Sequence, residues 1–211
     1  MARHADAGDA VHIVILGEGI TARGNGASGS RNRGALAALR RDAERAAEIV
    51  GAASLRTHRL PDNRFDSIPL LDIIKIVEKE KQRTQPTFVY THHANDLNID
   101  HRRVADAVQT AFRPLPDERP STILAFETSS STEYQSPLVG TPFRPSVYVD
   151  IEKFLDHKCR AMAAYRSEVR PYPHPRSPEA LRVIAKRAGL EVGIEAAERF
   201  SLVRMIVKGS L

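Results

Sequence analysis

The sequence predicts an α/β protein with a Rossmann-like, three-layer, mostly parallel sheet. Short apolar, β-branched runs alternate with amphipathic helical stretches along most of its 211 residues, a pattern typical of right-handed βαβ units. A chain of this length suffices for one α/β domain and is short for two. We therefore expect a single domain over residues 1–211.

The first predicted strand is Val11–Leu16 (VHIVIL), an unbroken apolar run that we interpret as a buried parallel strand. Next, Gly17–Arg33 is rich in Gly, Ser, Asn and Arg and is expected to be a mobile loop, without the G-x-G-x-x-G spacing of a dinucleotide site. Helices and strands then alternate. Helices are expected near 35–50, 68–82, 101–112, 151–166 and 178–188, and further strands near 54–59, 87–91, 122–126, 146–149 and 200–207.

Composition and charge exclude several classes of protein. The net charge is +5 with a pI near 9.5, but basic and acidic residues are mixed, as in RRDAER, which argues against a nucleic-acid partner. A single cysteine, Cys159, excludes an internal disulfide and a multi-thiolate metal site. No apolar stretch reaches the roughly 18 residues of a membrane span, and the first residues lack a signal-peptide core. A cytoplasmic protein without a membrane span is expected.

The densest group of metal-capable side chains follows the predicted strand at 87–91, in THHANDLNIDHRR. Ligands of open parallel sheets bind at the carboxyl ends of strands, so a site is expected here. His101 should lie in the first turn of the next helix, with Asp100 as its cap. A capping loop with surface histidines is the alternative for any one residue taken alone. The group consists of His92, His93, Asp96, Asn98, Asp100 and His101.

The string DLNIDHR resembles the second signature of the PIG-L/LmbE family of zinc-dependent sugar N-deacetylases. Further segments agree with that family in order and spacing, so that the resemblance covers nearly the whole chain and implies an LmbE-like fold. These segments are the strand running into GEG, the helix with Arg41 and Glu44, the turn LPDNRFD, the helix with Lys158 and Tyr165, and the late PYPHPRS.

The resemblance implies hydrolysis of the N-acetyl group of an amino sugar or glycoconjugate by zinc-activated water. By position, His101 matches a zinc ligand, and Asp100 matches a residue that orients other side chains of the site. Asn98 stands where relatives carry a histidine that hydrogen-bonds the carbonyl oxygen. Its amide can donate a hydrogen bond but cannot carry the proton.

Two other segments are candidates for substrate contact. His174 in PYPHPRS is a candidate for the acid that protonates the leaving amine or for an oxyanion donor, and Arg176 can face an anionic part of the substrate. Asp62, Asn63 and Arg64 in LPDNRFD offer donors and acceptors to sugar hydroxyls. Plain turns, one with a histidine between prolines and one of the P-D-N type, are the alternatives.

The family's first signature, a strand running into H-P-D-D-E, does not occur in the sequence. The resemblance assigns two zinc ligands and the general base to that motif. We therefore expect the first strand of the fold to be missing, Zn²⁺ to be held only in a complete protein, and the 211-residue chain to be inactive and poorly soluble. An upstream start is favoured over a real loss of the strand, because the downstream motifs are intact.

Two other functions are compatible with parts of the sequence. A non-catalytic remnant of the same fold would bind a sugar or a partner without chemistry. A basic α/β protein that binds nucleotide or nucleic acid is disfavoured, because the sequence has neither a phosphate-cradling glycine motif nor a basic stripe with aromatics. The sequence leaves open which sugar is bound, in which pathway, and whether the chain forms a homo-oligomer.

Overall fold

The computed structural model of the protein describes residues 1–20, 29–116 and 122–207. The chain divides into two compact units, each made of two separate stretches. The first unit is Met1–Asp62 with Val149–Glu198, and the second is Asn63–Tyr148 with Arg199–Leu211. The single domain expected over residues 1–211 stays a prediction, and residues 21–28 of the predicted loop lie outside the described residues.

The first unit contains a parallel pair of strands. β1 (His12–Gly17) pairs with β2 (Ser54–Leu60), with His12 opposite Ser54. The parallel direction is as predicted, but the interpretation of β1 as a buried strand is wrong, since only Leu16 of this strand is buried. Among the described residues β1 has a ladder partner on one edge only, so most of its side chains stay partly exposed.

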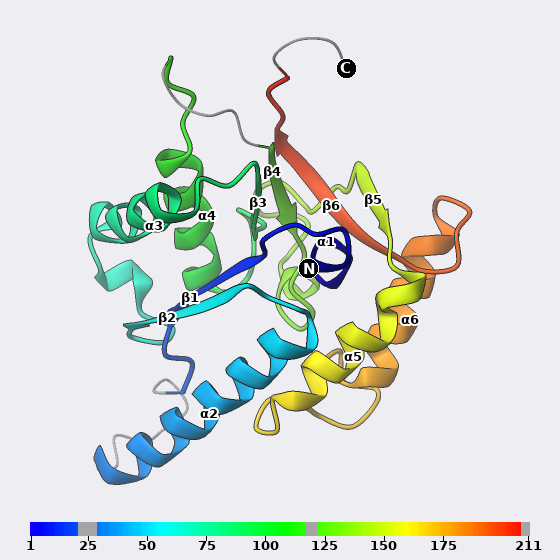
Figure 1. Cartoon of the computed structure of the whole chain (residues 1–211), viewed down its shortest axis with the longest axis horizontal. Coiled ribbons are helices and arrows are strands. Elements are labelled where there is room, and N and C mark those ends of the chain that lie inside the picture. The colour runs from blue at the N-terminus through cyan, green and yellow to red at the C-terminus, as the bar shows by residue number, and fades with distance from the viewer. Residues whose placement is uncertain (21–28, 117–121, 208–211) are drawn as a thin grey trace. The chain divides into compact units, whose positions relative to one another are not determined.

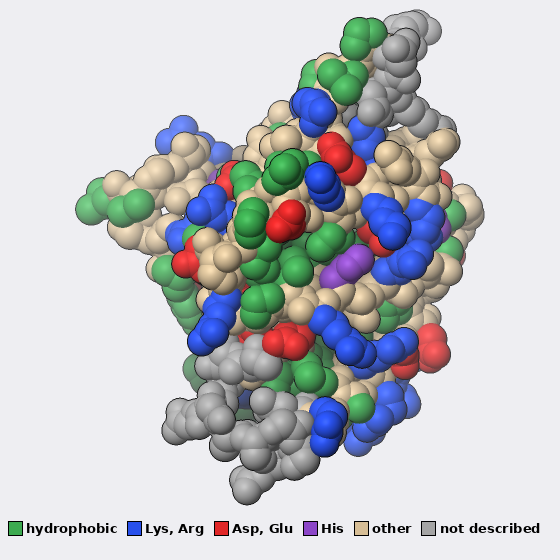
Figure 2. Space-filling model, turned by 90° about the vertical axis from the view of Figure 1, so that its left-hand side faces the viewer, with side chains coloured by type: hydrophobic (Ala, Val, Ile, Leu, Met, Phe, Trp, Pro, Cys, Tyr) green, Lys and Arg blue, Asp and Glu red, His purple; other side chains and the backbone are tan. Residues whose placement is uncertain are grey.

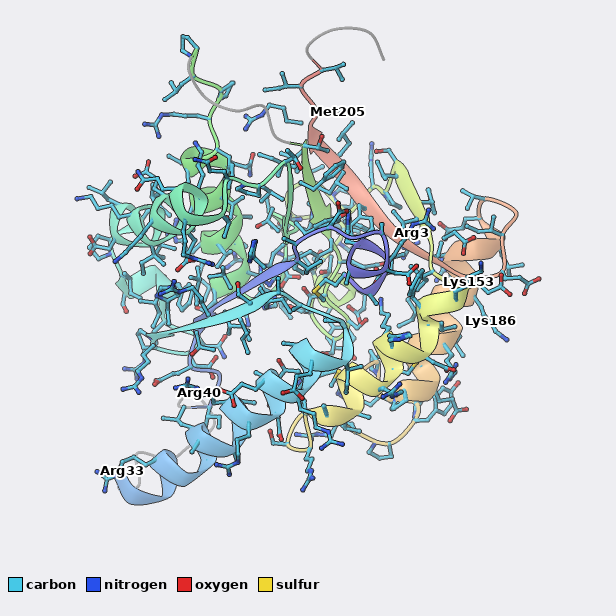
Figure 3. The ribbon with its side chains drawn as sticks, viewed as in Figure 1. Arg3, Arg33, Arg40, Lys153, Lys186 and Met205 are labelled. Atoms are coloured by element: carbon cyan, nitrogen blue, oxygen red, sulfur yellow. The ribbon has the colours of Figure 1, made fainter. Side chains whose placement is uncertain are left out.

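The first unit also contains helices, which Figure 1 labels. α1 (Ala2–Asp6) precedes β1, and α2 (Gly29–Ile49) crosses over to β2, on which it packs. α5 (Leu155–Ala164), which follows the short turn η4 (Glu152–Phe154), packs against both α2 and α6 (Pro178–Leu190). Figure 3 shows Arg33 and Arg40 projecting from α2, and Arg40 pairs with Glu44 at 3.0 Å on the same helix.

The core of the α5–α6 region follows the apolar spacing of the two helices. Ser177 caps α6, because its Oγ accepts the Ala180 backbone N–H at 2.9 Å, and Pro178 occupies the first helical position. The buried residues of this cluster are Ile151, Leu155, Cys159, Leu181, Ala185 and Ala196.

The second unit is organised by a sheet in the order β3-β4-β6-β5. β3 (Phe88–His92) runs parallel to β4 (Thr122–Phe126), with Phe88 opposite Thr122. β6 (Ala197–Arg204) is antiparallel to β4, and β5 (Val147–Asp150) forms the edge. The sheet is therefore mixed, with its parallel part at β3 and β4.

Two helices of the second unit lie beside these parallel strands (Figure 1). α3 (Leu70–Thr84) packs on α4 (Ile99–Ala111), and α4 packs on β3. Short turns, η2 (Phe65–Ser67) and η3 (Thr132–Tyr134), precede α3 and follow β4. The side chains of Phe65, Ile73 and Ile123 are almost completely buried. The chain β3–α4–β4 is thus one parallel βαβ unit, which confirms the α/β class predicted from the sequence.

The surface shows the mixed charge that the sequence predicts. Lys and Arg side chains interleave with Asp and Glu on the face in Figure 2, without a patch of one sign over the whole face. Within the described ranges, the helices are too short or too polar for any of them to cross a membrane.

Candidate functional site

Two loops meet at the carboxyl ends of β3 and β4. Because these strands are parallel, with His92 opposite Phe126, the residues after each strand emerge at the same edge of the sheet. The His93 backbone N–H donates to the carbonyl oxygen of Phe126 at 3.1 Å and joins the two loops. The candidate site is formed by these loops, residues 93–98 and 127–132, together with the first turn of α4.

The first turn of α4 is capped by Asn98. Its Oδ1 accepts the backbone N–H of Asp100 at 2.8 Å, and the helix begins at Ile99. The expectation that Asp100 is the cap is wrong, because Asn98 has the extended backbone of a cap residue, whereas Asp100 is already inside the helix. His101 does lie in the first turn, as predicted. Asn98 keeps its Nδ2 amide as a donor.

A buried carboxylate, Asp96, is the centre of the site. Its side chain has 0% exposure, and it accepts hydrogen bonds from His101 Nδ1 (2.9 Å), Thr132 Oγ1 (2.5 Å), the Asn98 backbone N–H (2.9 Å) and Ser131 Oγ. Burial raises the pKa of Asp96, but the donors, His101 foremost, outweigh it and hold this pKa well below its ordinary value. Asp96 is therefore an ionised acceptor.

The ring of His101 is fixed on its edge and on its face. Asp96 Oδ1 already accepts the Asn98 backbone N–H, so it is an acceptor for His101 too; Nδ1 therefore carries a proton, and in the neutral ring Nε2 carries the lone pair. His92 stacks on His101, with the ring centroids 4.2 Å apart and the planes at 16°. Burial, and then the proximity of His101, lowers the pKa of His92 to about 3, so this ring is neutral at physiological pH.

Asp100 has a different task from Asp96. Its buried carboxylate accepts the backbone N–H groups of Asn63 at 2.7 Å and of Phe65 at 2.9 Å. These bonds bring the turn with Asn63 and Arg64 to the first turn of α4. Asn63 has a φ of 54°, a left-handed conformation that asparagine tolerates better than most residues. Asp62, the remaining predicted residue of this turn, belongs to the first unit.

His174 and Arg176 lie in the first unit, in the turn that leads into α6. The Arg176 backbone N–H donates to His174 Nδ1 at 3.1 Å, so the proton of the neutral ring is on Nε2. The Arg176 guanidinium donates to the Glu168 carboxylate, which neutralises its charge. His174 therefore presents an N–H donor, and Arg176 is a fixed cation with a carboxylate partner.

The residues present fit one ligand position of a zinc site. Metal-binding histidines commonly donate their second ring N–H to a carboxylate, as His101 does to Asp96. A catalytic zinc ion needs three protein ligands, and within the described ranges no group of three or more His, Cys, Asp or Glu side chains is placed to hold a metal. The described residues therefore match the metal in one ligand and do not form a complete site.

Sequence reasoning assigned no role to Asp96, Ser131 or Thr132. Asp96 was visible as one of the six polar residues after β3, but its sequence position does not distinguish it from Asp100. Ser131 and Thr132 belong to a run of hydroxyl residues, TSSST, that is separated from the end of β4 by one residue. A polar run at the end of the neighbouring parallel strand is the signal that would have found them.

Solved structures that resemble this chain include several deacetylases. N,N'-diacetylchitobiose deacetylase from Pyrococcus horikoshii matches with a TM-score of 0.73 and 21% identity, over 96% of this chain and 76% of its own. The conserved protein TT1542 from Thermus thermophilus matches with a TM-score of 0.70 and 20% identity, over 99% of this chain and 88% of its own. GalB, the 4-carboxy-2-hydroxymuconate hydratase from Pseudomonas putida, matches with a TM-score of 0.71 and 25% identity, over 100% of this chain and 90% of its own.

The fold is therefore the α/β fold of the LmbE-like deacetylase structures. The family model PIG-L, GlcNAc-PI de-N-acetylase, matches residues 1–112. The chain belongs to the PIG-L family, as the motif DLNIDHR predicted. A comparison with curated proteins gives no match.

Proposed function

We propose that the site belongs to a zinc-dependent N-deacetylase of an amino sugar or sugar conjugate. Water adds to the acetyl carbonyl, the C–N bond breaks, and acetate and the free amine are released. Zinc, when bound, polarises this carbonyl and lowers the pKa of its bound water. The observation that carries the proposal is His101, whose Nε2 is left for a metal by the bond of Nδ1 to Asp96.

The chain's own residues would bind and orient the sugar around His101. Asp100 holds the turn that presents Asn63 and Arg64, whose polar groups suit sugar hydroxyls. Asp62, next to them in sequence, is proposed for the same task. Asn98 Nδ2 can donate to the acetyl oxygen while its Oδ1 caps α4.

The geometry of His174 supports one of its two predicted roles. A general acid must be protonated on both ring nitrogens, and the Arg176 N–H pointing at Nδ1 opposes that form. A neutral ring with Nε2–H suits an oxyanion donor instead. Arg176, held by Glu168, is proposed to face an anionic part of a conjugate.

The 211-residue chain is proposed to be inactive by itself. The described residues supply one metal ligand with its orienting carboxylate, and a single imidazole does not hold zinc against water at cellular concentrations. A sugar-binding protein without chemistry remains the second candidate for the same reason. The cytoplasmic location and the oligomeric state stay predictions.

One experiment separates these functions by measuring binding and turnover on the same purified chain. N,N'-diacetylchitobiose and N-acetylglucosamine are added to ¹⁵N-labelled protein, with glucosamine as the matched ligand that lacks the acetyl group. We expect the acetylated sugars to shift the amide signals of Arg64, Asn98 and His101 more than glucosamine does, with acetate release at background.

Three other outcomes contradict parts of this proposal. Acetate release with one equivalent of zinc would show that the chain holds a complete metal site. Absence of any sugar-dependent shift would contradict the substrate class. Binding and hydration of a hydroxymuconate dicarboxylate, with no sugar binding, would favour the chemistry of GalB instead.

A further inference from the structure

Asp96 is the most completely buried carboxylate among the residues of the second unit that the structure describes. Transferring a carboxylate from water is costly unless donors compensate for the lost hydration. Here the compensation comes from three places in the chain, which are the residue's own loop at Asn98, the loop after β4 at Ser131 and Thr132, and the first turn of α4 at His101. A carboxylate surrounded in this way has one orientation.

The hydrogen bond between His101 and Asp96 does more than hold the two loops together. Asn98, Ser131 and Thr132 already donate to Asp96, so loop closure alone does not need a fourth donor. The bond from His101 instead fixes the rotation of its ring, and the stacked His92 fixes the ring plane. What remains unfixed is Nε2, at the opposite end of the ring from the bonded edge.

We propose that Asp96 is the positioning residue of the site. It holds His101 as the Nδ1–H tautomer with Nε2 as the ligand atom, and Ser131 and Thr132 hold Asp96 in the orientation that this needs. The metal-ligand role of His101 rests on the proposed function. The tautomer does not, because it is a property of the chain without metal or substrate.

The test is the tautomer itself, read by long-range ¹H–¹⁵N NMR on the 211-residue chain labelled at histidine. In the neutral ring of His101 we expect a protonated Nδ1 and an unprotonated Nε2. In Asp96→Ala no acceptor holds the Nδ1–H, so His101 should populate both neutral tautomers. Zinc should then bind the variant at least tenfold more weakly than the original chain, as read from the ring shifts during titration.

The matched control is Asp100→Asn. It makes the same change of charge one residue from His101, but Asp100 accepts only backbone N–H groups, so the His101 tautomer should be unchanged. If Asp96→Ala does not fold, Thr132→Val and Thr132→Ser are a milder pair of substitutions. Thr132→Val should broaden the His101 ring signals, and Thr132→Ser, which keeps the hydroxyl, should restore them.

The wild-type spectrum alone can overturn the proposal, whatever the variants do. A His101 ring with its proton on Nε2, or one that exchanges between both tautomers, would show that Asp96 does not position it. An unchanged single tautomer in a folded Asp96→Ala protein would do the same. Failure of sugar binding or deacetylation would leave these readings intact and would count against the proposed function only.

Discussion

The backbone N–H of Asn63 donates to the Asp100 carboxylate at 2.7 Å, and that of Phe65 donates to the other oxygen at 2.9 Å. One buried side chain thereby closes a turn that precedes it by more than thirty residues in the chain. The residues proposed to contact the sugar hydroxyls owe their position to this carboxylate.

Asp100→Ala should therefore destabilise the second unit. Two buried N–H groups lose their acceptor, and each unsatisfied group costs on the order of 1–3 kcal/mol, so we expect a loss of about 3 kcal/mol in the free energy of unfolding. Urea unfolding followed by circular dichroism measures it. Asp106→Ala, on the same helix but partly exposed beside Arg103, should change that free energy by less than about 0.5 kcal/mol. Equal effects would contradict the role of Asp100.

Asn98 has two functions that substitution can separate. Asn98→Ala removes the cap of α4 and should lower stability by about 1 kcal/mol. Asn98→Asp keeps an acceptor for the cap but loses the amide donor, so stability should stay while binding of N-acetylglucosamine weakens. Thermal unfolding and ligand titration by NMR are the two measurements. Full sugar binding by Asn98→Asp would show that Nδ2 does not contact the ligand.

Much of this site could be predicted, because the local pattern of apolar and polar residues determines where its strands and its helix lie. Alternating apolar runs located β3, α4 and β4, and the polar residues after β3 placed His101 in the first turn of α4. The cap was assigned wrongly, since Asn98 and Asp100 both favour that position and only the backbone shows which one is outside the helix. Asp96 and its hydroxyl partners escaped prediction, because their contacts join loops that only the parallel pairing of two strands brings together.

His101 and His174 should carry opposite tautomers. His174 accepts the Arg176 backbone N–H at Nδ1, so NMR should find its proton on Nε2, unlike that of His101. Arg176→Ala keeps the backbone donor and should leave the His174 tautomer unchanged. Arg176→Pro removes the donor and should allow both tautomers. A proton on Nδ1 of His174 in the original chain would contradict the oxyanion-donor role.

Glu198 makes the stability of the first unit depend on pH in the acid range. Burial raises the pKa of Glu198, but Lys158, whose Nζ lies 2.5 Å from its carboxylate, and the N-terminal amino group together outweigh burial, so the folded pKa is below the ordinary value of 4.5. Since the folded pKa is depressed, this stabilisation is present above about pH 4.5 and is lost as the pH falls through the folded pKa.

Glu198→Gln should accordingly flatten the acid side of the stability profile, measured by urea unfolding over a series of pH values. Glu179→Gln, a substitution of an exposed glutamate at the start of α6, is the control and should keep the original slope. If Glu198→Gln leaves the acid slope unchanged, the pair with Lys158 does not contribute to stability.

The central claim is that His101 offers Nε2 to a metal ion. The most direct test is a zinc titration of the histidine-labelled chain, with the ring nitrogens of all eight histidines followed together. We expect Nε2 of His101 to shift at lower zinc than any other ring nitrogen, with weak, non-stoichiometric binding that His101→Ala removes. If the exposed His4–Asp9 pair, also joined through Nδ1, responds first while His101 stays unchanged, the claim is contradicted.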